Sequence, residues 1–281
     1  GSLRLVCAAD SAAELEFWRS ESVAAESLSC QELRRYEPAV QAEPMHVVRL
    51  SEQCQIRNPR HLKALIAACR KAGVEFYEGT PVTGWDVEHE RVVAARTATG
   101  KIAAGQFVIA AGAWSKTLLE SAGCPLPVEP VRGQIALLKS RAGLFQHIVE
   151  QGTRYLVPRD DGRVVVGSTE ERVGYIKANT AQGIQGLLEF ASQVVPTLAD
   201  AELERCWSGL RPGLGTALPV IGAVPPMENL YVAAGHLRSG LQNSPGTAIL
   251  LRERLLGQSS SIDLLPFNPA DRVPVHVASR A

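Results

Sequence analysis

Four short segments of strand-forming residues follow one another in the middle of the chain. They cover residues 134–138, 147–150, 155–158 and 163–168, and each has the length of an ordinary strand. Asp160-Asp161-Gly162 predicts the turn between the last two segments, because Asp and Gly tolerate the backbone angles of a tight turn. Strands that follow one another this closely predict a β-rich middle section.

Helices and strands alternate on both sides of this section. The clearest helix is predicted from Asn58 as N-cap and Pro59 in the first turn to Gly73 beyond its end, with an apolar stripe at i, i+3, i+4 and i+7 that consists of Leu62, Leu65, Ile66 and Cys69. Residues 74–77 are predicted to follow as a short strand, and residues 106–110 as a buried strand that runs into Ala111-Gly112. The pattern favours an α/β domain interrupted by an α+β domain.

A second strand-to-helix junction is predicted near the C-terminus. Residues 230–234 form an apolar strand, residues 235–240 turn the chain, and an apolar helix reaches Leu256. Glycines stand at both junctions, where the backbone approaches a ligand closely in many α/β proteins. A plain connection between strand and helix fits the same residues equally well.

Composition excludes several function classes. The chain has 281 residues, 29 Lys plus Arg against 29 Asp plus Glu, and 46% apolar residues. These values are typical of a folded domain and exclude disorder and a globally basic nucleic-acid binder. No apolar run approaches the ~18 residues of a membrane helix, and nothing near Gly1 is typical of a secretory signal, so we expect a cytoplasmic protein. The six cysteines and six histidines are scattered, and no metal site is expected.

Three polar side chains lie in apolar, glycine-containing surroundings and are candidates for ligand binding: Tyr155, Arg211 and Arg238. Arg211 stands between Leu210 and Pro212, and a guanidinium in dry surroundings needs an anionic partner. A substrate carboxylate would supply one through a bidentate pair, and an acidic side chain of the protein would do so as well. The residues alone also allow Arg238 to be a surface arginine and Tyr155 a core tyrosine.

Several sequence blocks follow one another along the chain. Residues 155–159 read Y-L-V-P-R and residues 162–169 read G-R-V-V-V-G-S-T; residues 207–212 read W-S-G-L-R-P and residues 229–240 read N-L-Y-V-A-A-G-H-L-R-S-G. In this order the blocks resemble the glycine oxidase branch of the D-amino-acid oxidase family of flavoenzymes, with its segments Y-x-V-P-R, G-x-x-x-x-G-[AS]-T, W-x-G-x-R-P and N-L-[YW]-x-A-x-G-H-x-R-x-G. Residues 78–82 and 108–115 are similar to the family's segments beside the adenosine half of the flavin.

The resemblance implies an FAD-dependent oxidase of a small amino acid, such as glycine, sarcosine or a D-amino acid. The products would be an imine, then an oxo acid, and hydrogen peroxide from molecular oxygen. Arg211 would bind the substrate carboxylate, Tyr155 would line the same pocket, and Arg238 would lie beside substrate and flavin. Gln242 would either hydrogen-bond the flavin or face solvent. The residues expected to contact FAD are Val82, Ala111, Gly112, Trp114, Gly235, His236, Arg238, Ser239, Gly240, Leu241 and Gln242.

The implied fold is an FAD-binding-like α/β domain interleaved with an antiparallel-sheet α+β domain. Residues 1–55 and 128–211 would form the substrate domain, and residues 56–127 and 212–281 the remainder of the flavin domain. The G-x-G-x-x-G turn that places a pyrophosphate at a helix N-terminus has no counterpart in this sequence. Because Gly1 to Leu5 align beyond that turn, we expect an N-terminally incomplete flavin domain.

Two other hypotheses stay open at this point. The chain would be a non-catalytic fragment or subunit that needs a partner chain, or an amino-acid dehydrogenase that passes electrons to an acceptor other than oxygen. Besides the substrate, the expected partners are a complementing N-terminal fragment or further copies in a homo-oligomer.

Overall fold

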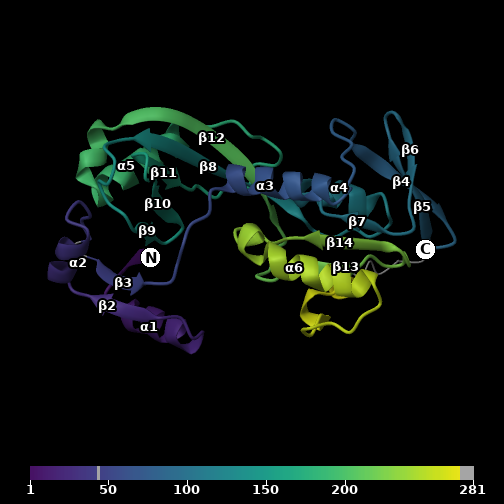
Figure 1. Cartoon of the computed structure of the whole chain (residues 1–281), viewed down its shortest axis with the longest axis horizontal. Coiled ribbons are helices and arrows are strands. Elements are labelled where there is room, and N and C mark those ends of the chain that lie inside the picture. The colour runs from purple at the N-terminus through teal and green to yellow at the C-terminus, as the bar shows by residue number, and fades with distance from the viewer. Residues whose placement is uncertain (43–44, 273–281) are drawn as a thin grey trace, which may run out of the picture. The chain divides into compact units, whose positions relative to one another are not determined.

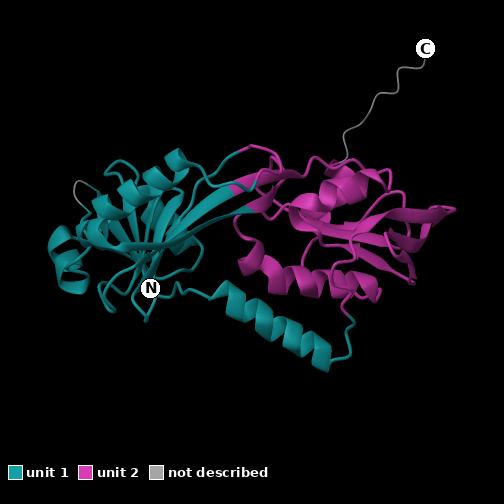
Figure 2. Ribbon diagram, turned by 90° about the horizontal axis from the view of Figure 1, so that it is seen from above, with its two compact units in different colours: residues 1–75, 133–171, 177–209 teal, residues 76–132, 172–176, 210–281 magenta. Residues whose placement is uncertain are grey.

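The computed structural model describes residues 1–42 and 45–272, and the chain folds into two compact units (Figure 2). Unit 1 comprises residues 1–75, 133–171 and 177–209, and unit 2 comprises residues 76–132, 172–176 and the chain from Leu210 onward. The expected assignment of residues 1–55 and 128–211 to substrate, and of 56–127 and 212–281 to flavin, stays a prediction. Its last residues, 273–281, lie outside the described part of the chain.

Unit 1 is built around a mixed sheet of eight strands, in the order β12-β8-β11-β10-β9-β1-β3-β2 (Figure 1). Most neighbours whose register is defined run antiparallel, whereas β1 and β9 run parallel. The strands are β1 (Ser2–Val6), β2 (Ala25–Leu28), β3 (His46–Leu50), β8 (Glu129–Lys139), β9 (Ile148–Gln151), β10 (Arg154–Pro158), β11 (Arg163–Gly167) and β12 (Glu202–Gly213). The unit's helices are α1 (Ser11–Ser20), α2 (Cys30–Tyr36), α3 (Asn58–Lys71), α5 (Ala181–Val194) and the short 3-10 turn η2 (Pro196–Asp200).

One face of this sheet is covered and the other is open. Successive side chains of a strand point to opposite faces; Leu156, Val164 and Val166 point into the core, where α5 contributes Leu187 and Phe190. All five side chains are at most 2% exposed. The residues between them in the strands, such as Val157 and Val165, lie on the opposite face. That face carries the cavity described below.

Unit 2 contains two three-stranded sheets, β13-β14-β7 and β4-β5-β6. Their strands are β4 (Val82–Glu88), β5 (Arg91–Thr97), β6 (Gly100–Ala103), β7 (Phe107–Ile109), β13 (Val220–Ala223) and β14 (Leu230–Ala234). The helical elements are η1 (Gly112–Trp114), α4 (Ser115–Glu120), α6 (Gly240–Leu255), η3 (Leu265–Phe267) and η4 (Pro269–Arg272). Buried side chains from both sheets and from α4 share one core.

A buried asparagine ties the two sheets of unit 2 together. Asn229, which is 3% exposed, accepts the Val92 N–H at 2.9 Å and donates to the carbonyl groups of Val92 and Gly105 at 2.8 and 2.9 Å. Its amide thereby satisfies backbone groups beside β5 and β7 that would otherwise be buried without partners.

The strand predictions for the middle section are confirmed. The four predicted segments fall within or overlap β8, β9, β10 and β11, and Gly162 has φ +81 in the predicted turn. Residues 106–110 and 230–234 form β7 and β14, and the following helix α6 ends one residue before the expected Leu256.

Two local predictions are wrong, and the apolar stripe of α3 is exposed. Helix α3 takes Arg57 rather than Asn58 as its N-cap. Residues 74–77 are irregular and belong to none of the described sheets, and Val74 and Tyr77 are 50% and 60% exposed, so burial does not hold them extended. The apolar stripe of α3 is not buried against the described chain: Leu62 is 55% and Leu65 47% exposed.

Candidate functional site

The predicted site residues fall in both units. Tyr155 lies on β10 of unit 1, whereas Arg211 on β12 and Arg238 before α6 belong to unit 2. Arg211 and Arg238 come from neighbouring segments, because the Leu237 N–H donates to the Pro212 carbonyl at 2.9 Å. The structure therefore places the two arginine-bearing segments side by side.

Tyr155 rests on the backbone of a glycine. On the antiparallel pair β10 and β11, Tyr155 lies opposite Gly167. A methyl group at Gly167 would lie 2.3 Å from Tyr155 Cζ and 2.4 Å from its hydroxyl oxygen, far inside van der Waals contact. Glycine at this position therefore leaves room for the phenol ring beside the backbone of the next strand. The ring is half-buried and lines a cavity.

This cavity, of about 930 Å³, lies on the open face of the unit 1 sheet. Its apolar wall comes from strands β8, β10, β11 and β12 and from the segment before α3, and consists of Ile56, Ile135, Leu137, Val157, Val165 and Trp207. Its polar lining consists of Gln55, Arg57, Arg159, Arg163, Glu204 and Arg205. A concave site with apolar walls and a few grouped polar side chains is typical of small-molecule binding.

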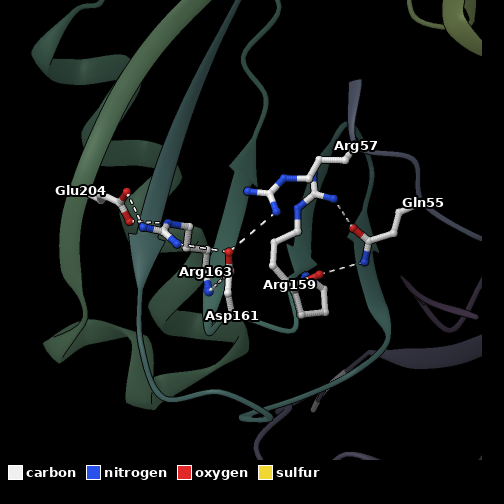
Figure 3. Close-up of polar contacts among 7 residues, drawn as sticks. Gln55, Arg57, Arg159, Asp161, Arg163 and Glu204 are labelled. Carbon is white, nitrogen blue, oxygen red and sulfur yellow. Dashed lines mark hydrogen bonds and ion pairs between the residues drawn. The ribbon is translucent and has the colours of Figure 1, made fainter. Parts of the chain in front are cut away.

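An ion-pair network borders the polar end of the cavity (Figure 3). Arg163 pairs with both carboxylate oxygens of Glu204, at 2.7 and 2.9 Å, and with Asp161 at 3.1 Å. A hydrogen bond from the Arg163 backbone, followed by its guanidinium, lowers the pKa of the Asp161 carboxyl, and Glu204 raises the pKa of Arg163. Both carboxylates therefore stay ionised and are already engaged. In the sequence, residues 160–162 indicate only a turn, and no pattern there points to this network.

A second candidate site lies at one edge of the β13-β14-β7 sheet. Strands β7 and β14 are parallel neighbours, and Ile109 pairs with Val232. Gly112 and Gly235 each follow their paired residue by three positions, and both have positive φ, +55 and +83. Because carboxyl ends of adjacent parallel strands meet at one sheet edge, the two glycine turns lie at the same edge. Helix α6 begins at Gly240, directly after the second turn.

Most residues predicted to contact FAD belong to these two turns. Ala111, Gly112 and Trp114 follow β7, and the stretch from Gly235 to Gln242 follows β14. Val82 stands apart at the start of β4, where it packs against the unit 2 core. Trp114 is 47% exposed and its ring lies 6.0 Å from that of Tyr175, whose hydroxyl donates to the Ala113 carbonyl at 3.1 Å. No sequence pattern points to Tyr175.

His236 lies within the second turn as a half-buried side chain. Its Nε2 is 3.0 Å from Thr247 Oγ1 on α6, and burial lowers the pKa of His236 below the ordinary 6.5. The ring thus links the turn to the helix without adding a charge at neutral pH.

Acidification is expected to destabilise the protein through His236. Its pKa is lower in the folded than in the unfolded state, so the unfolded chain binds the proton more readily. The contribution to stability is complete above about pH 6.5 and is lost as the pH falls through the folded pKa. Urea unfolding between pH 7.5 and 5 should show a shallower loss of stability in His236→Gln than in the unsubstituted chain. The exposed His46→Gln variant is the control, and equal slopes for His236→Gln and the unsubstituted chain would contradict the expectation.

Comparison with known proteins fits this geometry. The sequence profile of the FAD dependent oxidoreductases, DAO, matches residues 1–254. The chain belongs to this family of FAD-dependent oxidoreductases. It is 38% identical to the glycine oxidase of Pseudomonas aeruginosa over 237 residues, which are 84% of this chain and 65% of that protein. It is 36% identical over 242 residues to the hydrogen cyanide synthase subunit HcnC of the same species, 85% of this chain and 58% of that subunit.

The fold agrees with that of a solved relative. The crystal structure of glycine oxidase from Geobacillus kaustophilus matches with a TM-score of 0.91 and 29% identity, over 99% of this chain and 75% of that one. The expected glycine oxidase-like fold is therefore confirmed. The chain spans 65% of the length of the Pseudomonas aeruginosa glycine oxidase.

The family depends on FAD, and the edge of unit 2 fits part of such a ligand. A Cβ at Gly112 would meet no protein atom within 4 Å, so an extended group can approach this backbone closely. At Gly235 a Cβ would lie 3.1 Å from the Leu214 side chain, which explains the second glycine by packing. The N-terminus of α6 adds a partial positive charge at the same edge.

Neither a membrane-spanning helix nor a metal-binding cluster is found among the described residues. No helix within the described residues is long and apolar enough to cross a membrane. No group of three or more His, Cys, Asp and Glu side chains in residues 1–42 and 45–272 is arranged to hold a metal ion.

Proposed function

We propose that this chain carries out the FAD-dependent oxidation of a small amino acid, such as glycine, sarcosine or a D-amino acid, with oxygen as electron acceptor. The observation that carries the proposal is the contact of Leu237 N–H with the Pro212 carbonyl. It brings the W-S-G-L-R-P strand that bears Arg211 to the glycine turn that bears Arg238, at the sheet edge that fits the cofactor. Similarity to glycine oxidases supports the same reaction class.

The chain's own residues would bind and orient the substrate. Arg211 would pair with the amino-acid carboxylate, because a planar guanidinium matches a carboxylate in a bidentate pair. Arg238, in the adjacent turn, would lie beside the substrate, and Tyr155 would line the pocket. The residues of the turns from Ala111 to Trp114 and from Gly235 to Gln242 would hold the cofactor. FAD, when bound, supplies the acceptor for two electrons and the Cα hydrogen. The amino acid would leave as an imine that water hydrolyses, with hydrogen peroxide formed from oxygen.

FAD retention tests the cofactor half of this proposal. The purified chain is incubated with FAD and desalted, and the visible flavin absorbance that remains is measured. Gly112→Val is expected to reduce the retained flavin absorbance. A branched side chain is strained at φ +55 and would cover the backbone that the cofactor is proposed to approach. Gly257→Val is the matched control, since Gly257 also has a positive φ, +64, and open surroundings but lies beyond α6.

Amine-dependent peroxide formation tests the reaction half. Glycine and sarcosine should each be offered to the flavin-loaded chain, and peroxide and oxygen uptake should be followed together. Turnover with an artificial acceptor and no peroxide would favour the dehydrogenase hypothesis. A flavin-loaded chain that oxidises no amine with either acceptor would contradict the proposal.

The exposed apolar stripe of α3 favours a second hypothesis, in which the chain works together with a partner chain. Leu62, Leu65 and Ile66 are 38% to 55% exposed, and a contiguous apolar helix face is more often covered than left in water. A colourless chain after desalting would support this alternative over independent activity.

A further inference from the structure

Two arginines at the polar end of the unit 1 cavity, Arg57 and Arg159, have no close carboxylate of their own in the described chain. Arg57 Nη1 lies 3.7 Å from Asp161 Oδ2, a long ion pair with a carboxylate that Arg163 already holds at 3.1 Å. Arg159 makes no ion pair in the described chain, and its Nη1 donates to Gln55 Oε1 at 2.6 Å. The other carboxylate at this end, Glu204, is engaged by Arg163 through two hydrogen bonds.

The local charge balance is positive. Arg57, Arg159 and Arg163 face the two carboxylates of Asp161 and Glu204, and Arg205 lines the same cavity. Burial, followed by the positive charge of Arg57, lowers the pKa of Arg159. Neighbouring positive charges disfavour each other, and an anion between or beside them removes this repulsion.

Gln55 holds one of these arginines in place. Its Oε1 accepts from Arg159 and its Nε2 donates to the Pro158 carbonyl at 2.8 Å (Figure 3). Both ends of the amide are therefore used, and the Arg159 guanidinium is oriented before any ligand arrives. Preorganised donors of this kind bind an anion at a lower entropic cost.

The polar end of the cavity is too far from Tyr155 for its arginines to contact a small amino acid that lies against Tyr155. Tyr155 and Val157 alternate on β10, Arg159 follows directly after the end of this strand, and all three line the cavity. At ~3.3 Å per residue, the Cα of Arg159 is about 13 Å from that of Tyr155, more than glycine or sarcosine spans. Apolar side chains, including Val157 and Leu137, occupy the wall in between.

We propose that Arg57 and Arg159 form an anion-binding site that takes the carboxylate or phosphate group of a small molecule in the unit 1 cavity. The site stands on unit 1 alone and does not depend on the proposed amine oxidation. The same chemistry would serve a free phosphate and the carboxylate of a molecule whose apolar stem lies along Val157, and the test separates these two sources.

Calorimetric titration of the whole chain with inorganic phosphate and, separately, with hexanoate tests the site. Binding of either probe is expected, and tighter binding of hexanoate would identify a ligand with an apolar stem, whereas tighter phosphate binding would identify a free anion. Arg159→Gln and Arg57→Gln should each weaken the affinity for the bound probe by about tenfold or more, which is the ratio expected for the loss of one charge-assisted hydrogen bond. Arg91→Gln is the matched control, because Arg91 is an exposed arginine paired with Glu228 in unit 2.

Two results would overturn the proposal. One is that neither probe binds the unsubstituted chain at millimolar concentration. The other is that either cavity variant, with a circular dichroism spectrum matching that of the unsubstituted chain, binds as tightly as the Arg91→Gln control. The use of two separate arginine variants keeps the test decisive if one of them fails to fold.

Discussion

Replacing Gly167 by alanine is expected to displace the Tyr155 ring from the sheet. The added methyl group would lie 2.3 Å from Tyr155 Cζ, so either the ring swings into the cavity or strands β10 and β11 move apart. Overpacking of this kind costs about 1 to 3 kcal/mol of stability. If Tyr155 lines the substrate pocket as proposed, a shift of about 1 Å would also slow amino-acid oxidation by about 100-fold.

A double-mutant cycle separates this clash from other effects of the added methyl group. Urea unfolding should show that Gly167→Ala destabilises the unsubstituted chain but costs almost nothing in a Tyr155→Ala background, because the clashing ring is then absent. Gly105→Ala is the control, since a Cβ there would meet nothing within 4 Å. An equal cost of Gly167→Ala in both backgrounds would show that the ring is not what confines this position to glycine.

Replacing Arg211 by alanine is expected to weaken amino-acid binding by about 10- to 150-fold. The figure follows from the loss of a charge-assisted hydrogen bond worth about 1.5 to 3 kcal/mol. Flavin content should not change, because the turns assigned to the cofactor are separate segments. Glycine titrations of the flavin-loaded chain, followed by flavin absorbance, measure the affinity directly.

Two further variants define what Arg211 contributes. Arg211→Lys keeps the charge but loses the planar pair, so it should recover only part of the affinity. Arg91→Ala, at an exposed arginine that pairs with Glu228, should bind glycine as the unsubstituted chain does. Unchanged glycine affinity in Arg211→Ala would remove the carboxylate assignment, and loss of flavin would show that the arginine supports the fold instead.

Much of the local structure could be predicted from the sequence because alternation and turn residues act over a few positions. The strands around residues 155–158 and 163–168 and the turn at Gly162 are of this kind. The strand prediction for residues 74–77 failed because it depends on distant parts of the chain. Apolar and aromatic residues form a strand only where they pair with a sheet and pack against it, and the local sequence does not show whether a sheet is there. The apolar stripe of α3 shows the same gap, because periodicity predicts which face is apolar and not what covers it.

The residues of the candidate site were also only partly predictable from the sequence. Family-like blocks pointed to Tyr155, Arg211 and Arg238, and their assigned roles stay predictions. The cationic end of the cavity was missed, because Gln55 and Arg159 are 104 residues apart in sequence and neither belongs to a pattern that suggests a pair. The role of Gly167 was also hidden, since only the register of β10 against β11 shows which ring it faces.

The interleaving of the two units also governs the order in which the chain can fold during synthesis. Strand β1 pairs with β3 inside the first 50 residues, but its other neighbour, β9, ends at residue 151. At about 5 to 20 residues per second, the ribosome needs roughly 5 to 20 s to add the ~100 residues between them. Throughout that interval the edge of β1 that later pairs with β9 is unpaired. Leu3 and Leu5 also lack most of the side chains that pack around them in the folded unit. The pairing of β1 with β9 is therefore late and long-range, and an open strand edge is a feature that other chains can bind.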